Sequence, residues 1–347
     1  MKQILGKTLT ELKRELVNNN FSDFRAEQIY NWLYKNLISQ PKKMTNIPEV
    51  LQTFLQNNYI FTIFNLEEVN EAQDGTLKFL WKTKDKNYLE SVLIPQDNSE
   101  NKYTACLSSQ IGCSLGCKFC ASGISGKTRD LSCGEIVEQL WQMANYLESQ
   151  NGHIRNIVFM GMGEPFLNYE ALKKSLNIFI EEKGFNIGRR RITVSTSGII
   201  PGIYSFAEDF TQVGLAISLH SADNKIRSEL VPINQKYPLQ DLKEALDYYF
   251  ELTGRRITLE YIVFENKNDG KQDMIKLKNF CSGFQSHINL IKANPVPELG
   301  INSTSHKNVV EFKKLLENSG LSVSIRKSRG KNKNAACGQL RINQEGR

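Results

Sequence analysis

Residues 108–123, which read SSQIGCSLGCKFCASG, place three cysteines close together at Cys113, Cys117 and Cys120. Glycine and serine are frequent in this stretch, which predicts a loop rather than a helix or a strand. The stretch overlaps the end of YTACLSS (residues 103–109), a run that predicts a β-strand. We therefore expect the cysteines on a loop that leaves the carboxyl end of a strand.

Strand-like runs alternate with helical patterns along the rest of the chain. The runs that predict strands are YTACLSS, IRNIVFM, RITVST, VGLAISL, ITLEYIVF, HINLIK and LSVSIR. Helices between them are marked by a capping box at Ser132 and Glu135 and by terminal glycines at Gly254 and Gly320. Repeated strand–helix units imply a parallel sheet, so we expect an α/β fold with a partial (β/α)6 barrel. Active sites in such barrels lie at the carboxyl ends of the strands.

Two regions precede the barrel. Residues 1–65 are predicted to form a helical accessory domain that binds RNA, with a capping box at Thr8 and Glu11. Residues 66–102 are predicted to form a β-hairpin linker region, because LKFLWKTKDKNYLESVLIP alternates around the polar turn KTKDKN. The barrel is then expected to cover residues 103–347.

Composition and charge indicate the cellular setting. The chain has 347 residues and a net charge of +7, which weakly favours a polyanionic partner. Basic residues gather in KSRGKNKN near the end and in Arg189–Arg191 and Arg255–Arg256, where phosphate groups could be held. No apolar run approaches the roughly 20 residues of a membrane helix. The first residues form a charged helical pattern rather than a signal peptide. We therefore expect a cytoplasmic protein without a membrane partner.

The seven cysteines are an odd number, which in a cytosolic chain favours metal binding or redox chemistry over a disulfide framework. A [4Fe–4S] cluster is normally held by four cysteines. Three cysteines spaced C-x3-C-x2-C would leave one iron open to bind another group. An incomplete zinc site and a chance arrangement in a loop are the alternatives. Cys133 and Cys281 match no motif and are interpreted as structural thiols.

With Phe119 before the last cysteine, the motif resembles the cluster loop of the radical S-adenosylmethionine (SAM) superfamily. The resemblance implies one [4Fe–4S] cluster on three cysteines, with SAM bound to the open iron and cleaved to a 5′-deoxyadenosyl radical. MGMGEPFLN (residues 160–168) resembles the glycine-rich segment of the superfamily. Gly163 and Glu164 would then contact the SAM amino group.

Further motifs narrow the resemblance to the RlmN-type adenine C2 methyltransferases, which modify 23S ribosomal RNA and transfer RNA. They are SSQIGCSLGCKFCASG, FMGMGEPFLN, RRITVSTSGIIPGI, LAISLHS, LVPINQKYP and AACGQL. The resemblance implies further SAM contacts, from Ser195, Ser218, Leu219, His220 and Asn294. It also implies an electron donor such as flavodoxin or ferredoxin. We expect the chain to act as a monomer.

The same resemblance assigns three catalytic residues. Cys337 in AACGQL would accept a methyl group from one SAM, and a second SAM would supply the radical that removes a hydrogen from it. The resulting methylene radical would add to carbon 2 of adenine, in the peptidyl-transferase centre or next to the tRNA anticodon. Glu90 would accept a proton, and Cys106 would release the base by forming a transient disulfide with Cys337.

Three rival functions stay open on the sequence. A Cfr-type enzyme would methylate carbon 8 of the same ribosomal adenine, but Pro165 and Gly198 resemble the C2 group. A radical SAM enzyme without RNA, such as a glycyl-radical activase, would need neither Cys337 nor the helical N-terminal region. A non-catalytic iron–sulfur RNA-binding protein would need a fourth protein ligand for its cluster.

Overall fold

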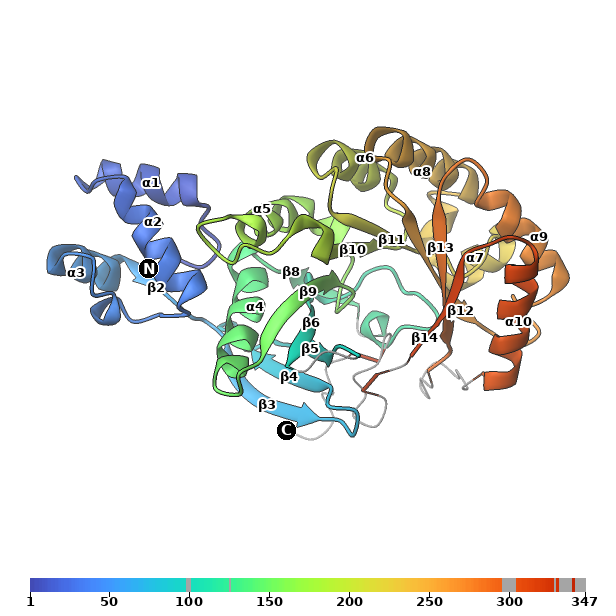
Figure 1. Cartoon of the computed structure of the whole chain (residues 1–347), viewed down its shortest axis with the longest axis horizontal. Coiled ribbons are helices and arrows are strands. Elements are labelled where there is room, and N and C mark those ends of the chain that lie inside the picture. The colour runs from blue at the N-terminus through green and yellow to red at the C-terminus, as the bar shows by residue number, and fades with distance from the viewer. Residues whose placement is uncertain (98–100, 125, 295–303, 328, 331–338, 341–347) are drawn as a thin grey trace.

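The structure is a computed structural model in which a small N-terminal helical unit lies beside a larger α/β unit (Figure 1). It describes all residues except 98–100, 125, 295–303, 328, 331–338 and 341–347. Cys337 therefore lies outside the described residues. No helix in the described part of the chain is long and apolar enough to cross a bilayer.

One sheet carries the larger unit, and the described residues give it ten strands in the order β14-β13-β12-β11-β10-β9-β6-β5-β4-β3. Its parallel part consists of β6 (Lys102–Cys106), β9 (His153–Phe159), β10 (Ile192–Thr196), β11 (Gly214–Ser218), β12 (Ile257–Val263), β13 (Ser286–Lys292) and β14 (Val323–Arg326). Strands β14 and β3 form the two open edges in this order. The expected partial barrel is confirmed.

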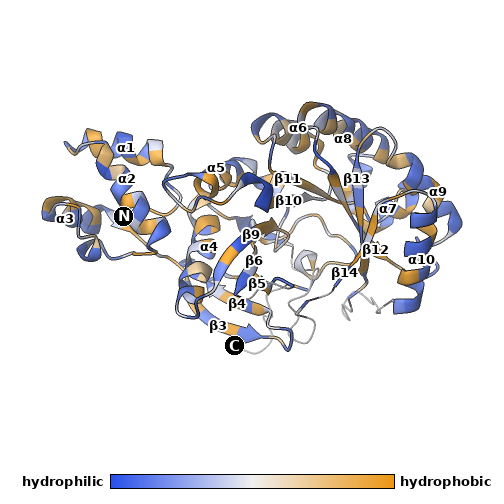
Figure 2. Ribbon diagram, viewed as in Figure 1, coloured by the Kyte–Doolittle hydropathy of each residue, from blue (hydrophilic) through white to orange (hydrophobic). Residues whose placement is uncertain are grey.

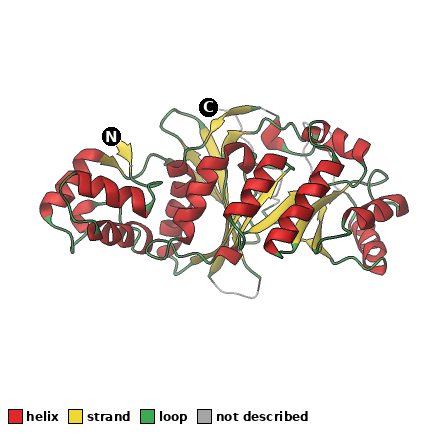
Figure 3. Ribbon diagram, turned by 90° about the horizontal axis from the view of Figure 1, so that it is seen from above, coloured by secondary structure: helices red, strands yellow, loops and turns green. Residues whose placement is uncertain are grey.

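Helices connect the parallel strands and cover one face of the sheet, as Figures 1 and 3 show. They are α4 (Cys133–Glu148), α5 (Tyr169–Ile180), α6 (Ile200–Asp209), α7 (Asn224–Leu230), α8 (Leu239–Thr253), α9 (Lys271–Phe280) and α10 (His306–Asn318). The capping box of Ser132 and Glu135 starts α4, and Gly254 ends α8 with a φ of 62°. Apolar residues of the strands are buried against these helices, whose outer sides carry the hydrophilic residues (Figure 2).

Three antiparallel strands extend the sheet beyond β6: β3 (Asn65–Glu71), β4 (Leu77–Lys82) and β5 (Tyr88–Pro95). The expected hairpin corresponds to β4 and β5, and β5 pairs with β6 so that Val92 lies opposite Cys106. The edge strand β3 was not predicted. Its sequence NLEEVNE is charged and largely exposed, so it lacks the alternation of apolar residues that reveals a half-buried strand.

The N-terminal unit contains α1 (Leu9–Asn18), α2 (Phe24–Tyr30), the π-helical turn η1 (Asn31–Lys35), the short η2 (Pro41–Lys43) and α3 (Glu49–Asn58). Strands β1 (Lys2–Gln3) and β2 (Tyr59–Ile60) pair in parallel beside these helices. The capping box of Thr8 and Glu11 is present at the start of α1. Leu12 and Leu16 of α1 and Leu51 and Leu55 of α3 are fully buried, and they belong to an apolar core that continues into the larger unit.

A buried carboxylate on α4 joins the two units. Glu138 accepts hydrogen bonds from the backbone N–H groups of Ile63 and Phe64, each 2.8 Å from Oε1. Its Oε2 atom accepts from Gln3 Nε2 at 2.6 Å, and Gln142 donates at 3.0 Å. Burial raises the pKa of Glu138 to about 7, although the N–H donors around it act in the opposite direction. The Glu138 side chain thus connects Gln3, near the start of the chain, with residues 63–64, which lead into β3 of the sheet.

Replacing Glu138 by Gln tests this junction. The variant places an NH₂ group against N–H donors, and an unsatisfied buried donor costs about 1–3 kcal/mol. We expect the free energy of unfolding to fall by about 2–3 kcal/mol, with faster proteolysis near residues 61–64. Urea unfolding and limited proteolysis measure both effects. Glu148→Gln, at the exposed end of the same helix, is the matched control. Equal stability of the two variants would contradict the junction.

Candidate active site

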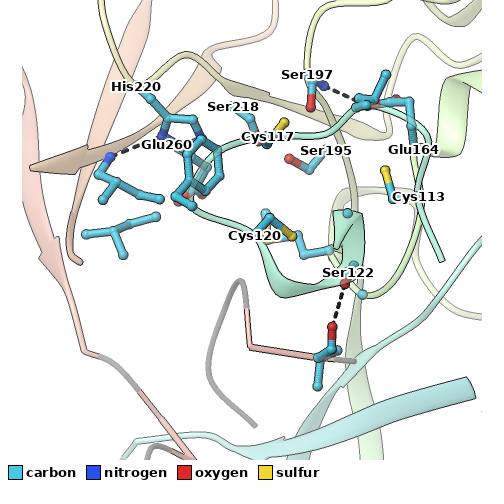
Figure 4. Close-up of a pocket in the computed structure, with 18 of the residues that line it drawn as sticks. Cys113, Cys117, Cys120, Ser122, Glu164, Ser195, Ser197, Ser218, His220 and Glu260 are labelled. Atoms are coloured by element: carbon cyan, nitrogen blue, oxygen red, sulfur yellow. Dashed lines mark hydrogen bonds between the residues drawn. The ribbon is translucent and has the colours of Figure 1, made fainter. Parts of the chain in front are cut away.

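The cysteine loop leaves the carboxyl end of β6, as expected, and its three sulfur atoms face one cavity (Figure 4). This cavity occupies about 1080 Å³, including the part open to solvent. The short strands β7 (Gln110–Gly112) and β8 (Lys127–Asp130) pair on either side of the loop. Asn168 donates to the carbonyl groups of Ser109 and Leu131 at 2.9 and 2.7 Å, which fixes the base of this hairpin.

The three thiols lie in surroundings that oppose their ionisation. Burial raises the pKa of Cys113 to about 12 and also raises the pKa values of Cys117 and Cys120. A buried thiolate is stable beside a metal, because ligation removes the thiol proton. Among the described residues, no three side chains of the metal-binding types surround a single point where one ion could be held.

Glu164 connects three strand ends at the wall of this cavity. Its carboxylate accepts from Ser197 N at 2.8 Å and from Phe166 N at 3.1 Å, while its own N–H donates to Gln110 Oε1 at 2.8 Å. Burial raises the pKa of Glu164, and these N–H donors counteract the rise. Gly163 has a φ of +96°, and a Cβ there would lie 2.5 Å from Gln110 Cβ. Only glycine fits this turn without displacing its neighbour.

His220 lies at the end of β11 with a φ of +56° and its ring against Phe119, at 4.3 Å between centroids. Its Nδ1 accepts from Ile262 N at 3.1 Å, which leaves the proton on Nε2. Burial lowers the pKa of His220 to about 3, so the imidazole is neutral at physiological pH. Nε2 is buried without a hydrogen-bond partner among the described residues. It is therefore a donor available to a ligand in the cavity.

The residues for which SAM contacts were expected mostly line this cavity. Those that do are Gly163, Glu164, Ser195, Ser218, His220 and Asn294. Leu219 differs, because its side chain is fully buried in the core. Its backbone N–H donates to Ile217 O at 2.9 Å and to Glu260 O at 3.1 Å, so it shapes the turn without facing the cavity.

Comparison with known proteins bears on these features. A model of the Radical SAM superfamily matches residues 107–277, and a model of the ribosomal RNA large subunit methyltransferase N-terminal domain matches residues 2–60. A probable dual-specificity RNA methyltransferase RlmN from Geobacillus kaustophilus is 44% identical over 97% of this chain and 92% of its own length. Its counterpart from Dictyoglomus turgidum is 41% identical over 98% and 97%, respectively. The chain belongs to the RlmN family.

A solved structure supports the same assignment. The crystal structure of a radical SAM methyltransferase from Sphaerobacter thermophilus superposes with a TM-score of 0.93 and 38% identity, over 98% of this chain and 99% of that chain. As a member of the RlmN family, the chain is a radical SAM RNA methyltransferase. The family resemblance of the sequence motifs is thereby confirmed.

The residues expected to perform the RlmN-type chemistry are placed only in part. Glu90 on β5 is buried and forms an ion pair with Lys78, 2.8 Å from its Nζ. Because Val92 lies opposite Cys106 and side chains alternate along a strand, Glu90 and Cys106 share one face of the sheet. Neither residue is among those that line the cavity, and Cys337 lies outside the described residues.

The described residues on either side of Cys337 make contacts at the rim of the barrel. Gly330 N donates to Asp74 at 2.9 Å, in the turn between β3 and β4. Leu340 O accepts from Ser122 in the cluster loop at 2.6 Å (Figure 4). The cysteines of the described residues are all free, so the structure supports no disulfide among them.

The sequence interpretation missed two charged residues of the cavity. Glu260 on β12 accepts from Asn289 at 3.2 Å and from Arg326 at 3.3 Å, and Arg326 also lies 3.4 Å from the sulfur of Met160. A signal was available for Glu260, since ITLEYIVF is a central strand with a single carboxylate. Charged residues in such positions are rarely buried unless they are paired.

Replacing Gly163 by Ala tests the turn that carries Glu164. The added Cβ would meet Gln110, and the strained backbone costs of order 1–3 kcal/mol. We expect this loss of stability together with at least a tenfold weaker SAM affinity, since Glu164 must move. Gly188→Ala is the control, because a Cβ there meets only Arg191 at 3.9 Å. Thermal unfolding and anaerobic calorimetry measure the two effects, and unchanged SAM binding in Gly163→Ala would contradict the role of the turn.

Proposed function

We propose that this chain methylates carbon 2 of adenine in 23S ribosomal RNA and in transfer RNA through a methylated Cys337. The observation that carries the proposal is the convergence of three half-buried thiols with Glu164 and His220 on one cavity at the carboxyl ends of the strands. The relatives from Geobacillus kaustophilus and Dictyoglomus turgidum are named as probable dual-specificity RNA methyltransferases. Their likeness over nearly the whole chain supports RNA as the substrate.

The residues present fit the cofactors that this family requires. Cys113, Cys117 and Cys120 would hold a [4Fe–4S] cluster, since all three line one cavity and lie within the residues that the Radical SAM model matches. When bound, the cluster and SAM together supply a carbon-centred radical that removes hydrogen from an unactivated methyl group. Glu164 would accept hydrogen bonds from the SAM amino group. His220 Nε2, the orphaned donor, would bind an oxygen of the same ligand.

The remaining SAM contacts would come from the neighbouring strand ends. Ser195, Ser218 and Asn294 line the cavity and present polar atoms beside the cysteines. Leu219 would contribute only its main chain, because its side chain is in the core. The electron would come from a flavodoxin or ferredoxin, and one chain would carry the whole catalytic set.

The chain's own groups then perform the transfer. Cys337 would carry the methyl group, and loss of one hydrogen from that group leaves a methylene that bonds to carbon 2. The radical adduct would return one electron to the cluster that supplied it, and Glu90, which pairs with Lys78 at 2.8 Å, would take up the proton that carbon 2 loses. Cys106 would then attack the sulfur of Cys337 as a thiolate and form a disulfide. The carbon–sulfur bond to the RNA would break, and the released carbon would keep its electron pair and take up a proton to complete the methyl group.

The RNA backbone would be held by arginines at the opposite end of the strands. Arg189–Arg191 directly precede β10, and Arg255–Arg256 directly precede β12. Arg190, Arg255 and Arg256 line one groove. Within the described residues none of these five arginines forms an ion pair, whereas Arg129, Arg326 and Arg329 do. We call the five residues the arginine patch. Arg189 also borders a groove with Thr8 and Tyr30 of the N-terminal unit, so the patch continues towards that unit.

The basic run after β14 is a weaker candidate for RNA contact. Lys327 and Arg329 form ion pairs with Asp97, the former at 3.1 Å. Their charges are therefore partly neutralised within the protein. Free guanidinium groups release more counterions from RNA when they bind phosphate.

The two catalytic cysteines can be separated by mutation. Cys337→Ala should still assemble the cluster, but it should form no methyladenosine and leave the RNA unattached to the protein. Cys106→Ala should complete the addition but fail to release the base, so RNA should copurify covalently bound to Cys337 through one SAM-derived carbon. Denaturing gels and mass spectrometry of digests detect the adduct. Cys281→Ala, another buried cysteine, is the control and should keep full activity. A Cys106 variant with an intact cluster and no adduct would contradict the resolving role.

The arginine patch predicts a change in the salt dependence of RNA binding. Each phosphate contact contributes about 0.7–0.9 to the slope of log affinity against log salt. Replacing Arg190, Arg255 and Arg256 together by Gln should therefore lower this slope by about 2. The control replaces the exposed Lys271, Lys278 and Lys314 by Gln and should leave the slope unchanged. Equal slopes for the two triple variants, measured by filter binding, would place the RNA elsewhere.

A further inference from the structure

A fully buried arginine lies behind the cavity wall. Arg227 on α7 has no exposed surface, and within the described residues its guanidinium donates only to neutral oxygen atoms. These are Leu219 O at 3.2 Å, Asn234 Oδ1 at 2.6 Å, Ser197 O at 2.7 Å and Ser218 O at 3.5 Å. The hydrogen bonds are satisfied, but neutral partners do not compensate the charge.

The charge of Arg227 has no carboxylate partner within the described residues. Burial lowers its pKa to about 10, and the acidic group that acts against this fall is the Cys117 thiol rather than an Asp or Glu. The guanidinium thus stays positive at neutral pH. Buried charges in proteins are normally paired or bound to metals. An unpaired guanidinium therefore points to a negative group nearby when the site is complete.

The contacts of Arg227 lead to the cysteine loop. The carbonyl group of Ser197 accepts a hydrogen bond from the guanidinium, and its side chain forms a hydrogen bond with the Cys117 side chain. Lys118 N donates to Leu230 O at 3.0 Å, so the loop is fixed to the end of the helix that carries Arg227. Gly198 has a φ of +105°, and a Cβ there would lie 3.3 Å from Arg227 Nη2. This turn permits the close approach of the guanidinium.

Other cations near the cavity are exposed to solvent, like Lys118 in the cysteine loop, or paired with carboxylates. Arg326 lines the cavity and pairs with Glu260 at 3.3 Å, and Lys127 pairs with Asp130 at 3.1 Å. Glu164 is a carboxylate and adds negative charge. Arg227 is therefore the cation best placed to offset the thiolates of the loop.

We propose that Arg227 is the buried counter-charge of the iron–sulfur cluster and favours its one-electron reduction. The inference rests on the proposed function, which places the cluster on Cys113, Cys117 and Cys120. One electron from a low-potential reductant adds one negative charge to the cluster, and a fixed positive charge beside it lowers the free energy of that state. Cluster potentials depend on such net charge and on burial.

A purely structural role for Arg227 makes a different prediction. If the guanidinium only fixes the carbonyl groups of Ser197 and Leu219, Arg227→Lys and Arg227→Gln should be similarly damaging, since both lose hydrogen bonds. If the charge matters, Lys should preserve the potential and Gln should not. Asn234→Asp gives a second test, because it places a carboxylate against the guanidinium and leaves Arg227 itself in place.

The experiment is a redox titration of the anaerobically reconstituted, full-length protein with dithionite, followed by electron paramagnetic resonance. At a fixed potential we expect Arg227→Gln to lower the reduced-to-oxidised ratio at least tenfold, which corresponds to about 59 mV for one electron. Asn234→Asp should lower it by at least threefold. Arg227→Lys should change it by less than threefold, and Lys225→Gln, an exposed charge on the same helix, should not change it.

Two results would overturn the counter-charge. One is a reduced-to-oxidised cluster ratio in Asn234→Asp that equals the wild-type ratio. This result would reject the counter-charge even if Arg227→Gln does not fold. The other is an equal shift in Arg227→Lys and Arg227→Gln. Failure of the cluster assignment looks different, because the wild-type protein would then hold no [4Fe–4S] cluster and show no titration at all. Failure of carbon 2 methylation alone would change the RNA product and leave the titration as it is.

Discussion

Parallel pairing of the strands from β6 to β14 is the constraint on which the site depends. Because all these strands point the same way, their carboxyl ends meet at one edge of the sheet. The cysteine loop, the Gly163 turn and the turns after β10 and β11 follow those ends. Glu164 then connects the loop, its own turn and Ser197 through hydrogen bonds of 2.8–3.1 Å. Residues far apart in the sequence are thereby held around one cavity.

The electrostatics of this cavity follow from burial. The thiols, Glu164 and His220 are all disfavoured in their charged forms by desolvation. A neutral imidazole and a carboxylate surrounded by N–H groups suit a ligand that carries both amino and carboxylate groups. The thiols require a metal group to become thiolates, and Arg227 supplies positive charge behind them. The site is therefore suited to ligands whose charges are opposite to those of the side chains that they contact.

Local sequence signals predicted the elements of this architecture well. The barrel strands are apolar runs, α1 and α4 begin at capping boxes, α8 ends at Gly254, and the cysteine spacing is typical of a radical SAM cluster loop. The edge strand β3 carried no such signal, because its exposed residues need not alternate. Leu219 was expected to contact SAM, and because strand alternation after Ser218 turns its side chain into the core, only its main chain is left for that contact. Arg227 and the Asp97 ion pairs could not be predicted, since their partners are set by tertiary packing and not by spacing along the chain.

Transfer of a SAM-derived carbon through Cys337 to carbon 2 of adenine is tested most directly with SAM whose methyl group carries three deuterium atoms. The reconstituted protein is incubated anaerobically with ribosomal or transfer RNA and a reductant, and the nucleosides are identified by mass spectrometry. We predict 2-methyladenosine with two deuterium atoms in the new methyl group, and 5′-deoxyadenosine that has gained one. Retention of all three deuterium atoms, or 8-methyladenosine as the product, would contradict the proposed function.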